Sequence, residues 1–195
     1  MKKLEDKIRE CGEVRPGNIL KVDMFLNHQI DPEMMEAIGQ EFYRLFKDEK
    51  VTKILTVEAS GIAMAIETAR AFGVPMIFAK KSQSKNIDPD VYATDVYSYT
   101  HGNTNSVRVS KKYLNSDDCV LIVDDFLANG EAMNGLVRLC EQAGAKVAGC
   151  GAAIEKGFQP GGKGLRERGF HVESLAIVDE MDGDTGLLKF RQQEG

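Results

Sequence analysis

The chain has 195 residues, a length that suits one domain, and its formal net charge of −5 with no long basic segment argues against nucleic acid as a partner. No apolar run approaches the roughly 20 residues that a membrane helix needs, and the charged first segment, MKKLEDKIRE, is not a signal peptide. The four cysteines form no CxxC pair, which favours free thiols and a cytoplasmic location over disulfides or a zinc site.

The first thirty residues predict a small N-terminal lobe. Leu4, Ile8 and Cys11 recur at helical spacing, so we expect a short amphipathic helix that ends before Gly12. Residues 13–30 read as irregular or weakly extended, and they carry apolar side chains that need a surface to cover. The lobe is therefore expected to lie over the main domain.

A helix and a β-α-β unit follow. Asp31 is a good N-cap with proline next to it, and the helix is expected to run to about Asp48. Strands at 52–57 and 75–79 then flank a helix at 62–72, an order that predicts two parallel strands.

The next segment, residues 82–110, predicts a long excursion that ends in an antiparallel hairpin. Residues 82–90 are polar and turn-prone, whereas 91–99 and 106–110 are expected to be strands around a turn at 101–103. Long excursions in compact domains are often lids over active sites, so a flexible lid is the expectation.

The segment from Cys119 to Gly135 predicts a buried strand, a turn and a helix. Val120–Val123 is an uninterrupted apolar run, and Asp124 and Asp125 stand where we expect the strand to leave the sheet. Residues 128–130 are small enough for a sharp turn, and the helix is expected to end near Gly144.

The remaining elements complete an α/β pattern. A strand at 146–154 precedes a glycine-rich turn at 160–164 and a short helix at 165–168, and strands at 171–178 and 187–191 end the chain. The order predicts a mostly parallel sheet flanked by helices.

Three predicted strand ends carry residues suited to a phosphorylated ligand. They are Glu58–Gly61, Asp124–Ala132 and Lys156, with the lysine pair 80–81 at a fourth strand end. Ligands of such sheets sit at the carboxyl ends of the strands, and a small-residue turn that opens a helix attracts phosphate. Taken singly, the loop Glu58–Gly61 also fits an ordinary turn between a strand and a helix. The lysine pair 80–81 alone also fits a solvated surface. A receiver domain, which has similar paired acids, needs more residues than follow Asp125.

The stretch VLIVDDFLANGEA, Val120 to Ala132, resembles the PRPP-binding motif of the type I phosphoribosyltransferases. KVDMFLNHQIDP (Lys21 to Pro32), VEASG and IEKGFQPG (Ile154 to Gly161) are similar to the branch of bacterial xanthine phosphoribosyltransferases. The resemblance covers essentially the whole chain. It implies the type I phosphoribosyltransferase fold in a single domain, 1–195, with residues 1–30 as a hood over the base and an antiparallel flexible hairpin.

The resemblance also implies an enzyme of purine salvage that converts xanthine and PRPP to xanthosine 5-monophosphate and pyrophosphate, with Mg²⁺ carried by PRPP rather than bound directly by the protein. It implies a homodimer with small-molecule substrates. The implied PRPP-binding residues are Ala128, Asn129, Gly130, Glu131, Ala132, Glu58, Ala59, Ser60, Gly61, Lys80 and Lys81. The implied catalytic residues are Asp124 and Asp125, and the implied xanthine-binding residues are Leu20, Asn27 and Lys156. A strained peptide is expected at Ala59-Ser60.

One position departs from the related hypoxanthine–guanine enzymes, which carry an aspartate in the phosphate loop as a proposed general base. This chain has Ala128 there, so the motif provides no proton acceptor. We hypothesise that the site selects a xanthine that has already lost a proton.

Two alternatives stay open. One is a phosphoribosyltransferase for guanine, hypoxanthine or adenine. Lys156 argues against adenine, because the lysine ammonium and the amino group of adenine are both hydrogen-bond donors and would face each other. The other is a non-catalytic PRPP-sensing regulator, for which residues 1–30 are too short and too weakly basic to form a DNA-binding module.

Overall fold

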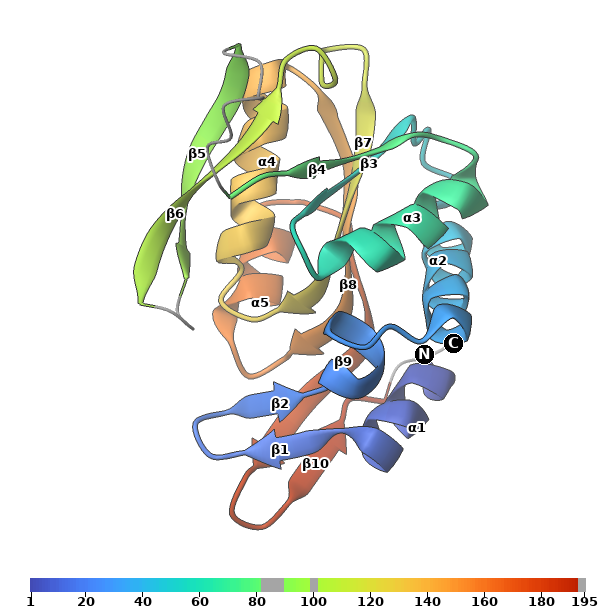
Figure 1. The fold of residues 1–195 in the computed structure, drawn as a ribbon, viewed down its shortest axis with the longest axis vertical. Coiled ribbons are helices and arrows are strands. Elements are labelled where there is room, and N and C mark those ends of the chain that lie inside the picture. Colours follow the sequence, from blue (N-terminus) through green and yellow to red (C-terminus); the bar gives the residue numbers. More distant parts are fainter. Residues whose placement is uncertain (82–89, 99–101, 193–195) are drawn as a thin grey trace.

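The computed structural model of the chain describes residues 1–81, 90–98 and 102–192. Its centre is a six-stranded sheet with the strand order β10-β9-β8-β7-β3-β4 (Figure 1). The strands are β3 (Lys53–Val57), β4 (Met76–Ala79), β7 (Cys119–Leu127), β8 (Lys146–Lys156), β9 (Val172–Asp182) and β10 (Leu187–Phe190). All neighbouring pairs are parallel except β9 and β10, which confirms the mostly parallel α/β sheet.

Helices cover both faces of this sheet. α2 (Pro32–Phe46) and α3 (Gly61–Phe72) bury their apolar sides in one core, and α4 (Glu131–Ala143) and α5 (Pro160–Glu167) contribute to the other. α2 begins where the sequence predicts, because the Asp31 carboxylate accepts hydrogen bonds from the amides of Glu33 and Met34. None of the described helices is both long enough and apolar enough to span a membrane.

Two glycines of β8 let α2 approach the sheet closely. A Cβ atom on Gly151 would lie 2.7 Å from the Phe42 ring, and one on Gly149 would lie 2.4 Å from the Phe46 ring. Both phenylalanines are fully buried. The small residues in β8 therefore create the space that the two rings of α2 fill.

The N-terminal lobe (residues 1–30) is more regular than expected. After α1 (Lys2–Cys11) it forms a short antiparallel hairpin of β1 (Glu13–Arg15) and β2 (Ile19–Lys21) and then a π-helical turn, η1 (Asp23–Asn27). The hairpin lies beside the extension formed by β9 and β10 (Figure 1). Periodicity did not indicate this hairpin, because its strands are only three residues long and their packing surface comes from elsewhere in the chain.

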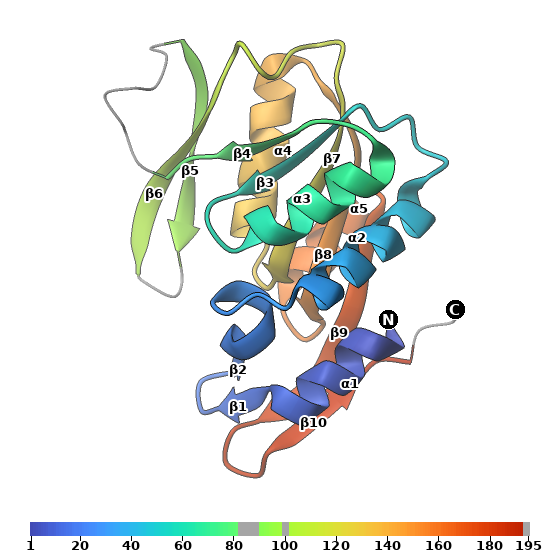
Figure 2. The same cartoon turned by 45° about the vertical axis from the view of Figure 1, so that its right-hand side comes forward.

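A second hairpin, β5 (Val91–Ser98) and β6 (Asn103–Ser110), is antiparallel as predicted. It forms a separate two-stranded sheet beside α4, and β6 also contacts β4 at the edge of the central sheet (Figure 2). Arg138 of α4 donates to the Thr94 hydroxyl and the Asp95 carbonyl, which fixes the hairpin to that helix. The rest of the predicted lid, residues 82–89 and 99–101, lies outside the described residues.

Several predicted boundaries were wrong. β6 begins at Asn103 rather than at 106, and β9 continues to Asp182 rather than ending at 178. β7 does not end before the aspartates, because Asp124 still pairs with Ala152 of β8 after pairing with β3 has stopped at Ile122. The segment 160–164 is not a turn but the first part of α5. Gly161 of this helix allows close packing, because a Cβ atom there would lie 2.5 Å from the Ala128 carbonyl oxygen.

We expect Gly151→Ala to lower the free energy of unfolding by about 1–3 kcal/mol, because the added methyl group would overlap the Phe42 ring in a packed core. Gly164→Ala is the matched control: nothing lies within 4 Å of the added Cβ, and alanine favours the helix by about 0.5–1 kcal/mol. Urea unfolding measures both changes. Equal midpoints for Gly151→Ala and the wild type would contradict this account of how α2 packs on β8.

Candidate active site

A cavity of about 400 Å³ lies between the end of β7, the loop after β3 and the β5–β6 hairpin. The residues that line it are Val57, Ser60, Lys81, Val96, Tyr97, Asn105, Val107, Asp124, Asp125, Phe126, Ala132 and Leu136. β7 extends beyond its paired neighbour β3 on this side, so its last residues can reach a ligand. The cavity thus joins several of the strand ends that the sequence singled out.

Asp124 and Asp125 are both buried, with 4% and 8% of their surface exposed. The Asp124 carboxylate accepts a hydrogen bond from the Asp125 amide, and the Asp125 carboxylate accepts one from the Phe126 amide. Burial and the neighbouring negative charge of Asp125 raise the pKa of Asp124 well above its ordinary value, and Lys81 opposes this shift. The pair is therefore a source of unfavourable electrostatic energy that a polar ligand can relieve.

The loop after β3 lies directly against these acids. It contains a cis peptide between Glu58 and Ala59, one residue before the peptide that we expected to be strained. A Cβ atom on Gly61 would lie 2.0 Å from the Thr56 hydroxyl and 3.2 Å from the Asp124 carboxylate, so only glycine fits. The buried Thr56 hydroxyl has no hydrogen-bond partner in the described part of the chain.

The structure separates the two lysines at the end of β4. Lys81 borders the cavity, and its backbone amide donates to the Glu58 carboxylate at 2.6 Å. Lys80 pairs through its backbone with Arg108 of the hairpin, and its ammonium lies 5.8 Å from the centre of the Phe78 ring. Lys80 is not among the residues that line the cavity. A sequence with two adjacent lysines could not indicate which one faces the ligand.

Residues 128–132 form the turn that opens α4. Gly130 has φ +86°, a left-handed conformation that favours glycine, and α4 starts at Glu131. The first amides of a helix have no partner within the helix and point away from its start, so they can bind an anion. Ala132 borders the cavity, which places this helix start next to the aspartates.

The N-terminal lobe reaches the same place from the other side. The Asn27 side-chain amide donates to the Asp125 carboxylate at 3.0 Å, across 98 positions of sequence. Lys156, at the end of β8, donates to the Asn18 carbonyl at 2.7 Å and lies 5.7 Å from the centre of the Phe126 ring. Partial burial lowers the pKa of Lys156 below its ordinary value.

Leu20 is buried in the core on which Phe126 packs. The structure thus gathers two of the implied xanthine-binding residues around the end of β7, and it places the third, Leu20, in the adjoining core.

Sequence reasoning missed several residues that line the cavity. Phe126 follows the aspartates in the motif, and its aromatic side chain at a strand end was a usable signal. Val96, Tyr97, Asn105 and Val107 come from the hairpin. They could not be selected from the sequence, because the docking of the hairpin on α4 decides which of its side chains face the cavity.

Comparisons with known proteins point in one direction. The family model described as "Phosphoribosyl transferase domain" matches residues 24–168. A xanthine phosphoribosyltransferase of Bifidobacterium animalis subsp. lactis is 56% identical over 192 residues, which cover 98% of this chain and 100% of that protein. A xanthine phosphoribosyltransferase of Limosilactobacillus fermentum is 53% identical over 195 residues, which cover 100% of this chain and 99% of that protein.

A solved structure with the same fold is the adenine phosphoribosyltransferase of Giardia lamblia complexed with 9-deazaadenine. It superimposes with a TM-score of 0.72 over 89% of this chain and 96% of that one, at 21% sequence identity. At this level of identity the likeness concerns the fold alone.

We expect Asp124→Asn to stabilise the free protein at neutral pH, because burial and the charge of Asp125 disfavour the Asp124 carboxylate. The folded-state pKa of Asp124 lies above the unfolded value near 3.8, so stability is lost as pH rises from that value through the folded pKa. Asparagine keeps the hydrogen bond to the Asp125 amide without this loss, and the gain should disappear near pH 4. Thermal unfolding across pH, with the exposed Asp48→Asn as a control, measures the effect. A variant that is less stable than the wild type at neutral pH would refute it.

Proposed function

The chain belongs to the phosphoribosyltransferase family, and from that premise we propose that it transfers the phosphoribosyl group of PRPP to xanthine in purine salvage. The products are xanthosine 5-monophosphate and pyrophosphate. The observation that carries the proposal is the 3.0 Å hydrogen bond between Asn27 and Asp125. It places the lobe assigned to the base next to the motif assigned to PRPP, so the two substrates could meet at one site.

The PRPP half of the site would work by electrostatics. We propose that the amides of residues 128–132 bind the 5-phosphate, and that Ser60, Gly61 and Lys81 bind the pyrophosphate. Displacement of pyrophosphate leaves negative charge on the departing oxygens, so donors placed there stabilise the transition state more than the ground state. A well-placed donor contributes about 3 kcal/mol in such sites. Asp124 and Asp125 border the same cavity and would accept hydrogen bonds from the ribose hydroxyls.

We propose that Mg²⁺ enters with PRPP. Magnesium is usually held by one or two carboxylates together with substrate phosphates and water. The cavity offers the carboxylates of Asp124 and Asp125, which fit that role through metal-bound water.

The base would lie between Asn27, Lys156 and Phe126. Asn27 can donate to the carbonyl at C2 that distinguishes xanthine from hypoxanthine, and Lys156 would face the O6 edge. Since position 128 is alanine, we propose that the base arrives as an anion, which the Lys156 ammonium stabilises. The hairpin would exclude water from the reacting centre, because Val96 and Val107 border the cavity.

The alternatives have less support. The regulator hypothesis needs a separate DNA-binding module, whereas Leu4, Ile8 and Leu20 of the N-terminal lobe are buried in the core of the same sheet. A preference for another purine conflicts with the names of relatives that are more than half identical over nearly the full chain. The homodimer and the cytoplasmic location remain predictions of the resemblance.

A panel of bases tests the proposal. We expect PRPP consumption to be fastest with xanthine, with kcat/KM exceeding that for hypoxanthine by about 100-fold or more, because a site built to hydrogen-bond a carbonyl rejects the analogue that lacks it. Guanine and adenine are measured in parallel. Faster turnover of adenine would refute the role of Lys156, and no turnover with any base would favour the regulator.

The pH profile tests the charge of the base. We expect kcat/KM for xanthine to rise as xanthine ionises and to fall as the Lys156 ammonium loses its proton, at a pH below the ordinary lysine value of 10.5. Burial lowers this pKa, so the positive charge is present only at lower pH. Lys156→Met should reduce kcat/KM and remove the alkaline decline. A profile with no inflection at the ionisation of xanthine would exclude the anionic substrate.

A further inference from the structure

The start of α5 packs directly against the loop that opens α4. The Gly161 amide donates to the Ala128 carbonyl at 3.0 Å. A Cβ atom on Gly161 would lie 2.5 Å from that carbonyl oxygen and 2.6 Å from the Gly130 nitrogen. Two backbones thus meet without a side chain between them, and any shift of α5 has to move residues 128–130 as well.

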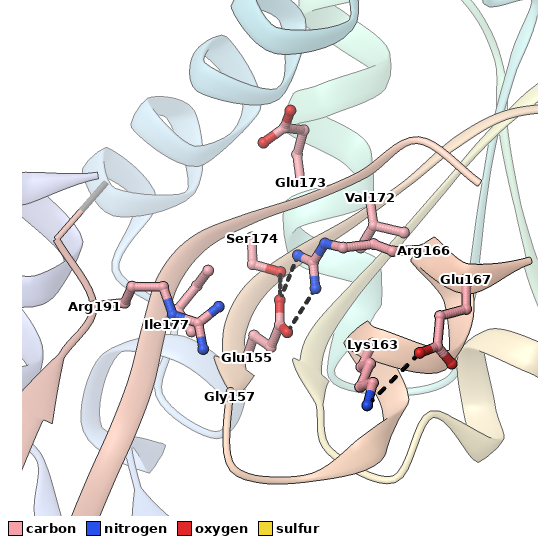
Figure 3. A pocket seen from close by; sticks show the side chains of 10 residues that line it. All are labelled: Glu155, Gly157, Lys163, Arg166, Glu167, Val172, Glu173, Ser174, Ile177 and Arg191. Carbon is pink, nitrogen blue, oxygen red and sulfur yellow. Dashed lines mark hydrogen bonds and ion pairs between the residues drawn. The ribbon is translucent and has the colours of Figure 1, made fainter. Parts of the chain in front are cut away.

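α5 is itself held by one buried carboxylate on β8. Arg166 donates to both oxygens of Glu155, each at 2.8 Å, and the Ser174 hydroxyl donates to the same carboxylate at 2.5 Å (Figure 3). Glu155 is only 3% exposed. Although burial raises the pKa of Glu155, the hydrogen bonds from Arg166 and Ser174 outweigh this effect and hold it below its ordinary value. Arg166 and Ser174 therefore stabilise the charged form of this buried carboxylate.

The first turn of α5 also rests on this carboxylate. A Cβ atom on Gly162 would lie 2.0 Å from a Glu155 oxygen, so the helix backbone sits on Glu155 at one end while Arg166 holds it at the other. A bidentate arginine–carboxylate pair fixes both distance and orientation. Removing one partner leaves a buried charge without compensation, which destabilises the protein more than breaking an exposed ion pair would.

This pair lies outside the cavity with the aspartates. Glu155 and Arg166 border a separate hollow of about 720 Å³, together with Lys163, Ser174 and Arg191 (Figure 3). Neither side chain lines the 400 Å³ cavity, and the two are engaged with each other, so they act on the Ala128–Gly130 turn only through the packing of α5. Any influence on the reaction has to pass through the position of α5.

We propose that the Glu155–Arg166 pair is a positioning device for the phosphate loop. It holds α5 on the sheet, and α5 in turn holds the Ala128–Gly130 backbone in the conformation that presents its amides to the 5-phosphate. This inference rests on the proposed function of the loop. It assigns Arg166, which the resemblance did not single out, a role in the affinity for the phosphoribosyl group.

The test uses ribose 5-phosphate as the probe, with calorimetric titration of the full-length protein. Arg166→Met should weaken its binding by about tenfold or more and raise KM for PRPP similarly, because small displacements of a positioned group are costly. KM for xanthine and kcat at saturating PRPP should stay near the wild-type values. Arg166→Lys keeps the charge but not the bidentate geometry, so its affinity for ribose 5-phosphate should lie between those of the wild type and Arg166→Met. If Arg166→Met does not fold, Arg166→Lys alone tests the proposal.

Lys163→Met is the matched control. It removes a positive charge from the same helix and the same hollow, but its ion pair with Glu167 is exposed and does not contact Glu155. It should bind ribose 5-phosphate as the wild type does. Equal weakening by Lys163→Met would assign the effect to the charge of the hollow and overturn the proposal.

Two failures are distinguishable. If the wild type binds ribose 5-phosphate and Arg166→Met and Arg166→Lys bind it equally well, only the positioning role is wrong. If the wild type binds neither ribose 5-phosphate nor PRPP, the proposed function itself fails.

Discussion

Two adjacent carboxylates buried at the end of β7 are the constraint around which the site is built. Asp124 and Asp125 continue a strand that has lost its neighbour β3, so they project where the sheet opens. Burying both costs free energy, which shows in the raised pKa of Asp124. The surroundings offset part of that cost, with backbone amides on both side chains, the Asn27 amide on Asp125 and Lys81 nearby. A ligand rich in hydroxyl groups would replace some of these partners.

Close backbone contacts then bring the other parts of the site to the aspartates. Gly61 lets the loop after β3 approach Thr56 and Asp124, and Gly161 lets α5 approach the turn before α4. Each contact leaves no room for a methyl group. Because these contacts involve the main chain, the loops are held at fixed positions without occupying the space that a ligand needs. If the positioning role proposed above holds, the packing of α5 on Glu155 affects a cavity that Glu155 does not line.

The N-terminal lobe and the hairpin complete the site from opposite ends. The lobe is tied to the sheet by Asn27 and by the bond from Lys156 to the Asn18 carbonyl, both of which end at β7 or β8. The hairpin is tied to α4 by Arg138. One element thus approaches from the side assigned to the base and the other from the side assigned to PRPP. The reacting carbon would lie between them, next to the aspartates.

The sequence by itself determined the order of strands and helices along the chain, the position of the two aspartates after an apolar strand, and the turn that opens α4. Apolar periodicity, the capping residue Asp31 and the glycines are local signals, so they can be recognised without the tertiary structure. It also indicated the family, through a motif that is contiguous. Only the tertiary structure decided which of Lys80 and Lys81 borders the cavity, that Asn27 bonds to Asp125, and that the glycines at 161–162 belong to a helix. These features depend on contacts between residues far apart in the chain. Local pattern carries no information about them until the sheet, the lobe and α5 are in place.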